Sequence, residues 1–272
     1  MTKIGFIGAG NMALAIMEGI LSTSTFKDKY PHANFIISDK SKSKLERFRN
    51  TFFDINIASS NVDLAKKADI LFLSVKPQNA VEVLEEINKQ LSSKQLIISI
   101  MAGITIKKIS QYVPVTQIAR VMPNNPALIQ QSMTAISFSD KITIKYKQVV
   151  WDIFSTVSKA VVVDEKLQNA ITAVSGSGPA FIYKIAQSII SGAKSIGLDK
   201  NIAQTLVAQT LVGAGAMLLK KDNIDVLIKN VASPGGTTEA GLKVLDEDTK
   251  WQKTLQQVII KSKNRADELS WD

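Results

Sequence analysis

Two hydrophobic patterns divide the chain. The first part alternates short, continuous apolar runs with stretches in which apolar residues recur every three or four positions. The continuous runs predict strands buried on both faces, and the periodic stretches predict amphipathic helices between them. This alternation is typical of a parallel sheet covered by helices on both sides. The predicted strands span residues 3–8, 34–39, 69–75, 95–101 and 116–122, and a later pair at 133–139 and 160–165 extends the sheet.

The strand signals end near residue 165. Every later segment has helical periodicity, and no repeat or linker-like composition separates the two parts. We therefore expect an α/β domain at residues 1–165 and an all-helical domain at residues 166–272. The predicted helices of the second domain span residues 167–174, 179–197, 201–220, 223–231, 237–248 and 250–269.

Composition narrows the functional classes. The 272 residues are enough for one large or two medium domains, each with a buried core, and the 45% hydrophobic content indicates a globular protein. The chain has no cysteine, which excludes disulfides, thiolate zinc sites and thiol catalysis and fits a cytoplasmic location. Residues 201–219 approach the length of a membrane span, but polar residues and glycines interrupt them, so we expect a buried helix and no membrane association. The formal charge of +9 comes from scattered lysines and arginines without a basic stripe, so nucleic-acid binding is not expected.

A glycine turn follows the first predicted strand. The sequence KIGFIGAGNMALAI places Gly8, Gly10 and Ala13 in the G-x-G-x-x-G/A arrangement at the start of a helix. The first glycine makes the tight turn, the second lets a diphosphate approach the backbone, and Ala13 lets the helix pack closely on the strand. In its strand-turn-helix context, this arrangement predicts that the chain binds a dinucleotide.

The ends of the neighbouring strands contribute the rest of the predicted cofactor site. Asp39 stands where an acidic residue holds the ribose hydroxyls of NAD, whereas Lys40, Ser41, Lys42 and Lys44 suit the 2′-phosphate of NADP, so the two interpretations compete. Lys42 and Lys44 equally fit the solvated start of a helix. We favour NADPH, with NADH as the alternative. The predicted cofactor residues from the turn and the strand ends are Ile7, Gly8, Ala9, Gly10, Asn11, Met12, Asp39, Lys40, Ser74, Val75, Lys76 and Pro77.

The side chains offer few reagents for catalysis. The one histidine, His32, lies in a polar loop before the second strand, away from the ligand-binding edge, and no carboxylates are spaced as metal ligands. A bound hydride donor removes the need for such groups. Near the C-terminus, NVASPGGTTEAGL interrupts two helices, and Ser or Thr at such a position caps the following helix. A helix N-terminus behind a glycine bend suits a carboxylate or a phosphate, although the same residues also serve as a plain turn.

Five motifs together resemble one enzyme family. GFIGAGNMALAI, VKP, ARVMPNNPA, SGSGPAFIY and SPGGTTEAGL occur in the order and approximate spacing of the pyrroline-5-carboxylate reductases, over nearly the whole chain. The last two motifs are the ones specific to this family, since many dehydrogenases share the first. The Gly-Pro pair in SGSGPAFIY is also common at the start of any helix. The chain departs from the family at Asn125, where a Thr is usual, and at Ala13-Leu14, where a Gly is common after the Asn-Met pair.

The resemblance implies a fold, an activity and an assembly. It implies a Rossmann-type domain followed by a helical dimerisation domain that interleaves with a second subunit, giving a homodimer with a decamer as a compatible higher assembly. It implies reduction of 1-pyrroline-5-carboxylate, a cyclic imino acid, to proline by NAD(P)H. It also implies that Met101 and Ala102 line the nicotinamide and that Asn230 borders the cofactor. The implied substrate residues are Glu165, Ser233, Gly235, Gly236, Thr237 and Thr238. In this arrangement the backbone amides of Gly235, Gly236 and Thr237 hold the substrate carboxylate, and the Thr238 hydroxyl is bonded to the ring nitrogen as the catalytic group.

Two rival functions fit part of the pattern. A related dehydrogenase acting on a hydroxy acid requires a catalytic Lys or His that faces the nicotinamide, and the helical half has no histidine. A non-enzymatic regulator would bind a dinucleotide without turnover. Catalysis by placement and by preorganised hydrogen-bond donors, without a strong acid, is what the residues allow.

Overall fold

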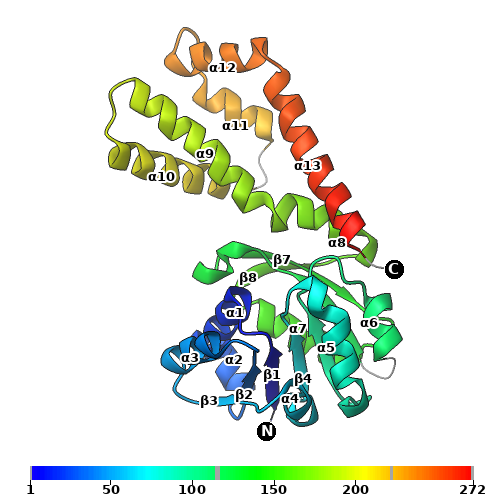
Figure 1. The fold of residues 1–272 in the computed structure, drawn as a ribbon. Coiled ribbons are helices and arrows are strands. Elements are labelled where there is room, and N and C mark those ends of the chain that lie inside the picture. The colour runs from blue at the N-terminus through cyan, green and yellow to red at the C-terminus, as the bar shows by residue number, and fades with distance from the viewer. Residues whose placement is uncertain (1, 114–116, 221–222, 271–272) are drawn as a thin grey trace. The chain divides into compact units, whose positions relative to one another are not determined.

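A computed structural model describes residues 2–113, 117–220 and 223–270. Thr116, in the predicted fifth strand, lies outside the described residues. Contacts divide the chain into two compact units: one runs to Ser177 and includes the segment from Ser262 onward, and the other is Gly178–Lys261 (Figure 1). These units are defined by packing, and the predicted domain boundary after residue 165 stays a prediction.

The described part of the first unit contains an eight-stranded sheet in the order β3-β2-β1-β4-β5-β6-β7-β8. Strands β1 to β6 run parallel, β7 is antiparallel to β6, and β8 is parallel to β7. This architecture confirms the predicted α/β fold with a mainly parallel sheet. The strands are β1 (Lys3–Ile7), β2 (Asn34–Ser38), β3 (Ile55–Ile57), β4 (Ile70–Leu73), β5 (Leu96–Ser99), β6 (Gln117–Met122), β7 (Ser132–Phe138) and β8 (Ser158–Val162).

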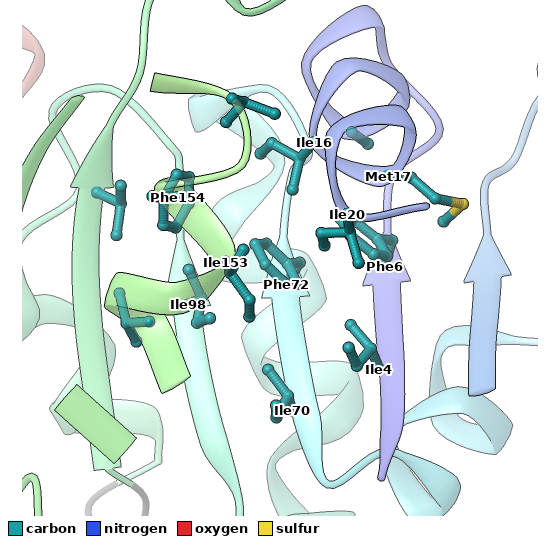
Figure 2. Close-up of a cluster of buried hydrophobic side chains, with 14 of the residues drawn as sticks. Ile4, Phe6, Ile16, Met17, Ile20, Ile70, Phe72, Ile98, Ile153 and Phe154 are labelled. Carbon is teal, nitrogen blue, oxygen red and sulfur yellow. The ribbon is translucent and has the colours of Figure 1, made fainter. Parts of the chain in front are cut away.

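Helices cover both faces of this sheet, as the apolar strands require. One buried cluster joins the sheet to α1, α2, α3 and α7, and a second joins the opposite face to α4, α5 and α6. In the first cluster, Phe6 of β1 stacks on Phe72 of β4 with ring centroids 4.3 Å apart, and Ile16 and Ile20 of α1 pack above them (Figure 2). The helices are α1 (Asn11–Ser22), α2 (Ser24–Lys29), α3 (Lys42–Thr51), α4 (Asn61–Lys67), α5 (Ala80–Ile87), α6 (Ile106–Tyr112) and α7 (Ile144–Phe154).

The sequence did not predict β3. This strand has three residues, and polar Asn56 occupies its centre, so it lacks the continuous apolar run that marks the other strands. It pairs with β2 at the edge of the sheet. Its position is set by pairing with β2 and not by its own propensity.

The second unit is helical, as predicted. Its helices are α9 (Gly178–Ser195), α10 (Lys200–Leu218), α11 (Ile224–Val231), α12 (Thr237–Glu247) and the first part of α13 (Lys250–Leu269). Within one chain, α10 buries only Ala203 and Val207, so the burial expected for this apolar helix is not provided by its own chain. Its exposed apolar residues are Ile202, Leu206, Val212, Met217 and Leu218. No helix in the described ranges has the length and apolarity needed to cross a membrane.

Candidate functional site

The glycine turn joins β1 to α1 with the backbone groups of α1 left open. Gly8 has φ +105°, and a Cβ there would lie 2.7 Å from the carbonyl oxygen of Ser74, so only glycine fits. Gly10 is the N-cap of α1 and supplies no side-chain cap, and a Cβ on Gly10 would meet no atom within 4 Å. The first N–H groups of α1 therefore have no side-chain cap, and the space beside Gly10 is open, which is the combination that a diphosphate requires. The residues present fit a dinucleotide.

Asp39 fixes the conformation of this turn. Its carboxylate accepts hydrogen bonds from the backbone N–H groups of Ala9 and Ser41, both at 2.8 Å, and from the Lys44 ammonium at 3.3 Å. Burial alone raises the pKa of Asp39, but the hydrogen bonds from Ala9, Ser41 and Lys44 outweigh it and leave the pKa below its usual value. Asp39 stays ionised at neutral pH and ties β2 to the glycine turn.

The strand ends form one hollow of about 520 Å³. Among the predicted cofactor residues, those that line it are Ile7, Gly8, Gly10, Asp39, Lys40, Ser74, Val75 and Lys76. The Ser74 hydroxyl contacts the carbonyl oxygens of Ile7 and Gly8, at 2.9 and 2.8 Å, which holds the end of β4 against the turn. Lys40 pairs with Glu82 at 2.7 Å, whereas the Lys76 ammonium has no ion-pair partner within the described ranges. Lys76 is thus available to an anionic ligand.

Other predicted cofactor residues lie outside this hollow. Ala9 is buried and contributes its N–H to Asp39, and the Asn11 side chain accepts from Arg47 at 2.7 Å. Met12 is half-buried at the start of α1, and Pro77 begins a short 3₁₀ helix. The Met101 side chain is buried in the second core cluster, next to the half-buried Ala102. Contact of these two residues with a nicotinamide stays a prediction.

Glu165 belongs to a part-buried hydrogen-bond network around the buried Arg120 guanidinium. It accepts from the backbone N–H of Ile106 at 2.7 Å and from the Arg120 guanidinium at 3.1 Å. Arg120 also donates to Asn169 at 2.9 Å, and Asn169 donates to Asp267 and Ser270, at 2.9 and 2.7 Å, near the end of α13. Glu165 thus pairs with the buried Arg120 guanidinium. Its contact with the substrate stays a prediction.

The SPGG segment forms the expected bend between two helices. Gly235 has φ +72°, and α12 begins at Thr237 with Gly236 as its N-cap. The expectation that a Ser or Thr side chain caps this helix is wrong, because Thr237 is already its first residue and Gly236 has no side chain to cap it. The first N–H groups of α12, those of Thr237 and Thr238, consequently have no intrahelical acceptor and suit an anion.

Thr238 and Asn230 lie at one apolar hollow. Side chains of α10, α11 and α12 line a space of about 440 Å³, including Met217, Leu227 and Leu242. Thr238 and Asn230 are the polar residues that line it. The structure therefore brings together the predicted catalytic hydroxyl and one predicted cofactor residue, Asn230.

Comparison with known proteins identifies the family. Residues 165–269 match the model of the pyrroline-5-carboxylate reductase dimerisation domain, and residues 3–103 match that of the coenzyme F420-dependent NADP oxidoreductases. Pyrroline-5-carboxylate reductase 2 of Bacillus subtilis (strain 168) is 34% identical to this chain, and the aligned region covers 99% of this chain and 95% of the Bacillus protein. The chain belongs to the pyrroline-5-carboxylate reductase family.

Solved pyrroline-5-carboxylate reductases have the same fold along the whole chain. The structure from Coxiella burnetii matches with a TM-score of 0.88 and 32% identity, covering 100% of this chain and 99% of that one. A pyrroline carboxylate reductase from Plasmodium falciparum, solved with NADP bound, matches with a TM-score of 0.85 and 30% identity, covering 99% and 98%. These matches confirm the predicted resemblance and fold class, and the dimerisation domain indicates a homo-oligomer.

Two polar residues that hold the reductase motifs in place, Asn124 and Arg120, were not predicted from the sequence. Asn124, in ARVMPNNPA, donates to the Ser175 carbonyl at 3.1 Å and accepts from the Ser132 hydroxyl at 2.9 Å, so it ties this motif to SGSGPAFIY. Arg120 lies inside the apolar strand β6, and this position alone predicts that its charge is paired with a buried partner. The identity of that partner was not readable from the pattern.

Proposed function

We propose that this protein reduces 1-pyrroline-5-carboxylate to proline with NAD(P)H, as the last step of proline synthesis. The observation that carries the proposal is the start of α12, where the uncapped N–H groups of Thr237 and Thr238 adjoin the Thr238 hydroxyl. The same chain has an open glycine turn that fits a dinucleotide. Relatives named pyrroline-5-carboxylate reductase, one of them solved with NADP bound, support it.

In the proposed reaction, the chain binds and orients its ligands without supplying a strong acid. The cofactor, when bound, supplies a hydride to the carbon of the ring C=N bond, and a proton reaches the ring nitrogen. The α12 N-terminus holds the substrate carboxylate, which complements the partial positive charge of the helix end. The Thr238 hydroxyl donates to the ring nitrogen, so that the electron pair arriving there meets a positioned donor. Ser233, Gly235 and Gly236 shape the bend, and Glu165 borders the substrate end.

We favour NADPH over NADH. Asp39 Oδ2 accepts from Ala9 and Lys44 and Oδ1 accepts from Ser41, so three of the roughly four acceptor sites of this carboxylate are filled and fewer remain for a ribose hydroxyl. Lys40, Ser41 and Lys44 line the same hollow, and Lys42 is the first residue of α3 beside them, so this cluster suits a 2′-phosphate. Met101, Ala102 and Asn230 complete the proposed cofactor contacts.

We infer a homodimer built by residues 166–272. The apolar residues exposed on α10 in one chain favour coverage by a second chain, since surfaces of this kind on helices mark interaction sites. A decamer of such dimers is compatible with the family resemblance. A chain without cysteine suits a reducing compartment, and we propose the cytoplasm.

One assay separates this function from its rivals. The rate of NADPH oxidation is followed spectrophotometrically with 1-pyrroline-5-carboxylate, and cofactor reduction is followed in parallel with a panel of hydroxy acids. Turnover of the imino acid alone is the expected result. Activity with a hydroxy acid alone would identify a related dehydrogenase, and cofactor binding without any turnover would identify a regulator.

A further inference from the structure

The bend before α12 contains a bond that the proposed function does not use. The backbone N–H of Gly235 donates to the Glu239 carboxylate at 2.8 Å, across four residues. The N–H of Gly236 donates to the Ser233 carbonyl oxygen at 3.0 Å. Of the three turn amides expected from the sequence to hold the substrate carboxylate, those of Gly235 and Gly236 therefore have partners inside the loop. The N–H of Thr237, with that of Thr238 in the same first turn, remains.

This pairing resembles a capping box shifted by one residue. Glu239 is the third residue of α12, and in a capping box a glutamate at that position reaches back to the N-cap N–H. Here it reaches one residue further, to Gly235, which has φ +72°. Two adjacent glycines have more backbone freedom than any other pair, so a bond from the helix to the first of them fixes the loop at its most mobile point.

We propose that Glu239 is a positioning residue for the substrate carboxylate. By holding Gly235, it keeps the bend in the conformation that leaves the N–H groups of Thr237 and Thr238 open to an anion. The proposal rests on the proposed function and adds to it a residue that does not itself touch the substrate.

The charge of Glu239 acts in the opposite direction, because one carboxylate repels another. Glu239 is exposed, and water and salt screen the repulsion between exposed charges. The hydrogen bond to Gly235 is a direct contact at 2.8 Å, which salt weakens less than it weakens the repulsion between separated charges. The positioning effect therefore outweighs the repulsion, and the neutral amide of a glutamine should preserve it.

Three variants test the proposal in steady-state kinetics with NADPH. Glu239→Ala removes both the bond and the charge, and Glu239→Gln removes the charge and keeps an acceptor oxygen. Asp225→Ala is the matched control, because it removes an exposed charge from the first turn of α11. We expect Glu239→Ala to raise KM for 1-pyrroline-5-carboxylate about fivefold, which corresponds to the roughly 1 kcal/mol that a cap bond typically contributes to a helix end, with kcat changed less than twofold. Glu239→Gln and Asp225→Ala should keep the wild-type KM.

A substrate without a carboxylate isolates the cause. With 1-pyrroline, KM should be the same in all four proteins, and KM for NADPH should not change. The inference is overturned if Glu239→Ala leaves KM for the imino acid unchanged, if Glu239→Gln is impaired as much as Glu239→Ala, or if both lower KM, which would make Glu239 a competitor of the substrate. Failure of the wild-type enzyme to reduce the imino acid would instead overturn the proposed function, and this inference with it.

Discussion

Replacing Glu165 with alanine should destabilise the first unit by leaving a buried cation without its counter-ion. The Arg120 side chain is 2% exposed and the Glu165 side chain 28% exposed. Glu165→Ala removes the ion pair at 3.1 Å and the acceptor for the Ile106 N–H at 2.7 Å. The Arg120 Nε has no hydrogen-bond partner among the described residues even in the wild type, so the guanidinium would keep only its bond to Asn169.

The magnitude follows from the burial of the pair. Removing one partner of a fully buried ion pair costs roughly 3–5 kcal/mol of the free energy of unfolding. Partial exposure of Glu165 lets water reach the vacated space and hydrate the guanidinium in part, so we expect about 2–3 kcal/mol. For a unit of this size, each 1 kcal/mol lowers Tm by about 2–4 °C, which gives a decrease of about 4–12 °C.

Thermal unfolding followed by circular dichroism measures this decrease. Glu165→Gln is the matched variant, because its amide oxygen still accepts from Arg120 and Ile106, and it should lose less than half as much stability as Glu165→Ala. A Glu165→Ala protein that unfolds at the wild-type temperature would refute the reasoning. If Glu165→Gln keeps its stability but raises KM for the imino acid, Glu165 contacts the substrate as the family resemblance implies.

Three further predictions concern catalysis, cofactor choice and assembly. Thr238→Ala should lower kcat roughly 100- to 1000-fold, as loss of one positioned donor does, and should leave NADPH binding intact. Thr238→Ser should stay largely active. A near wild-type kcat for Thr238→Ala would show that the proton comes from water or another group. Replacing Lys40 and Lys42 by alanine should weaken NADPH more than NADH in binding titrations, whereas equal losses would show that these lysines are only solvated. Sedimentation at low concentration should find at least a dimer, and a folded, active monomer would contradict the proposed assembly.

The features predicted correctly from the sequence are those set by local pattern. A continuous apolar run identifies β1, β4 and β5, and the spacing of Gly8 and Gly10 identifies the turn, because each depends on residues close together in the chain. Strand β3 was missed because its position depends on pairing with β2. Local pattern therefore predicts elements well and their partners poorly.

The site was harder to predict than the fold, because its residues contact partners that are distant in the sequence or depend on the loop conformation. Arg120 and Glu165 are 45 residues apart, and no periodicity links them. The sequence predicted a helix N-terminus after SPGG. It did not predict that the Gly235 N–H donates to Glu239 and the Gly236 N–H to the Ser233 carbonyl, because these bonds depend on the positive φ of Gly235. Which groups are open to a ligand is decided by the bonds that the loop makes with itself.

The apolar hollow around Thr238 links the proposed assembly to the proposed chemistry. In one chain, Thr238 lies among apolar side chains of α10 and α11. Water in that hollow would compete with the ring nitrogen for the Thr238 hydroxyl, and a hydrogen bond is stronger where water is excluded. A second chain that covers these helices would exclude it. We therefore expect a charged substitution at Met217, on the hollow but distant in sequence from the loop, to lower kcat in step with the loss of dimer in sedimentation. Loss of dimer with kcat unchanged would separate assembly from catalysis.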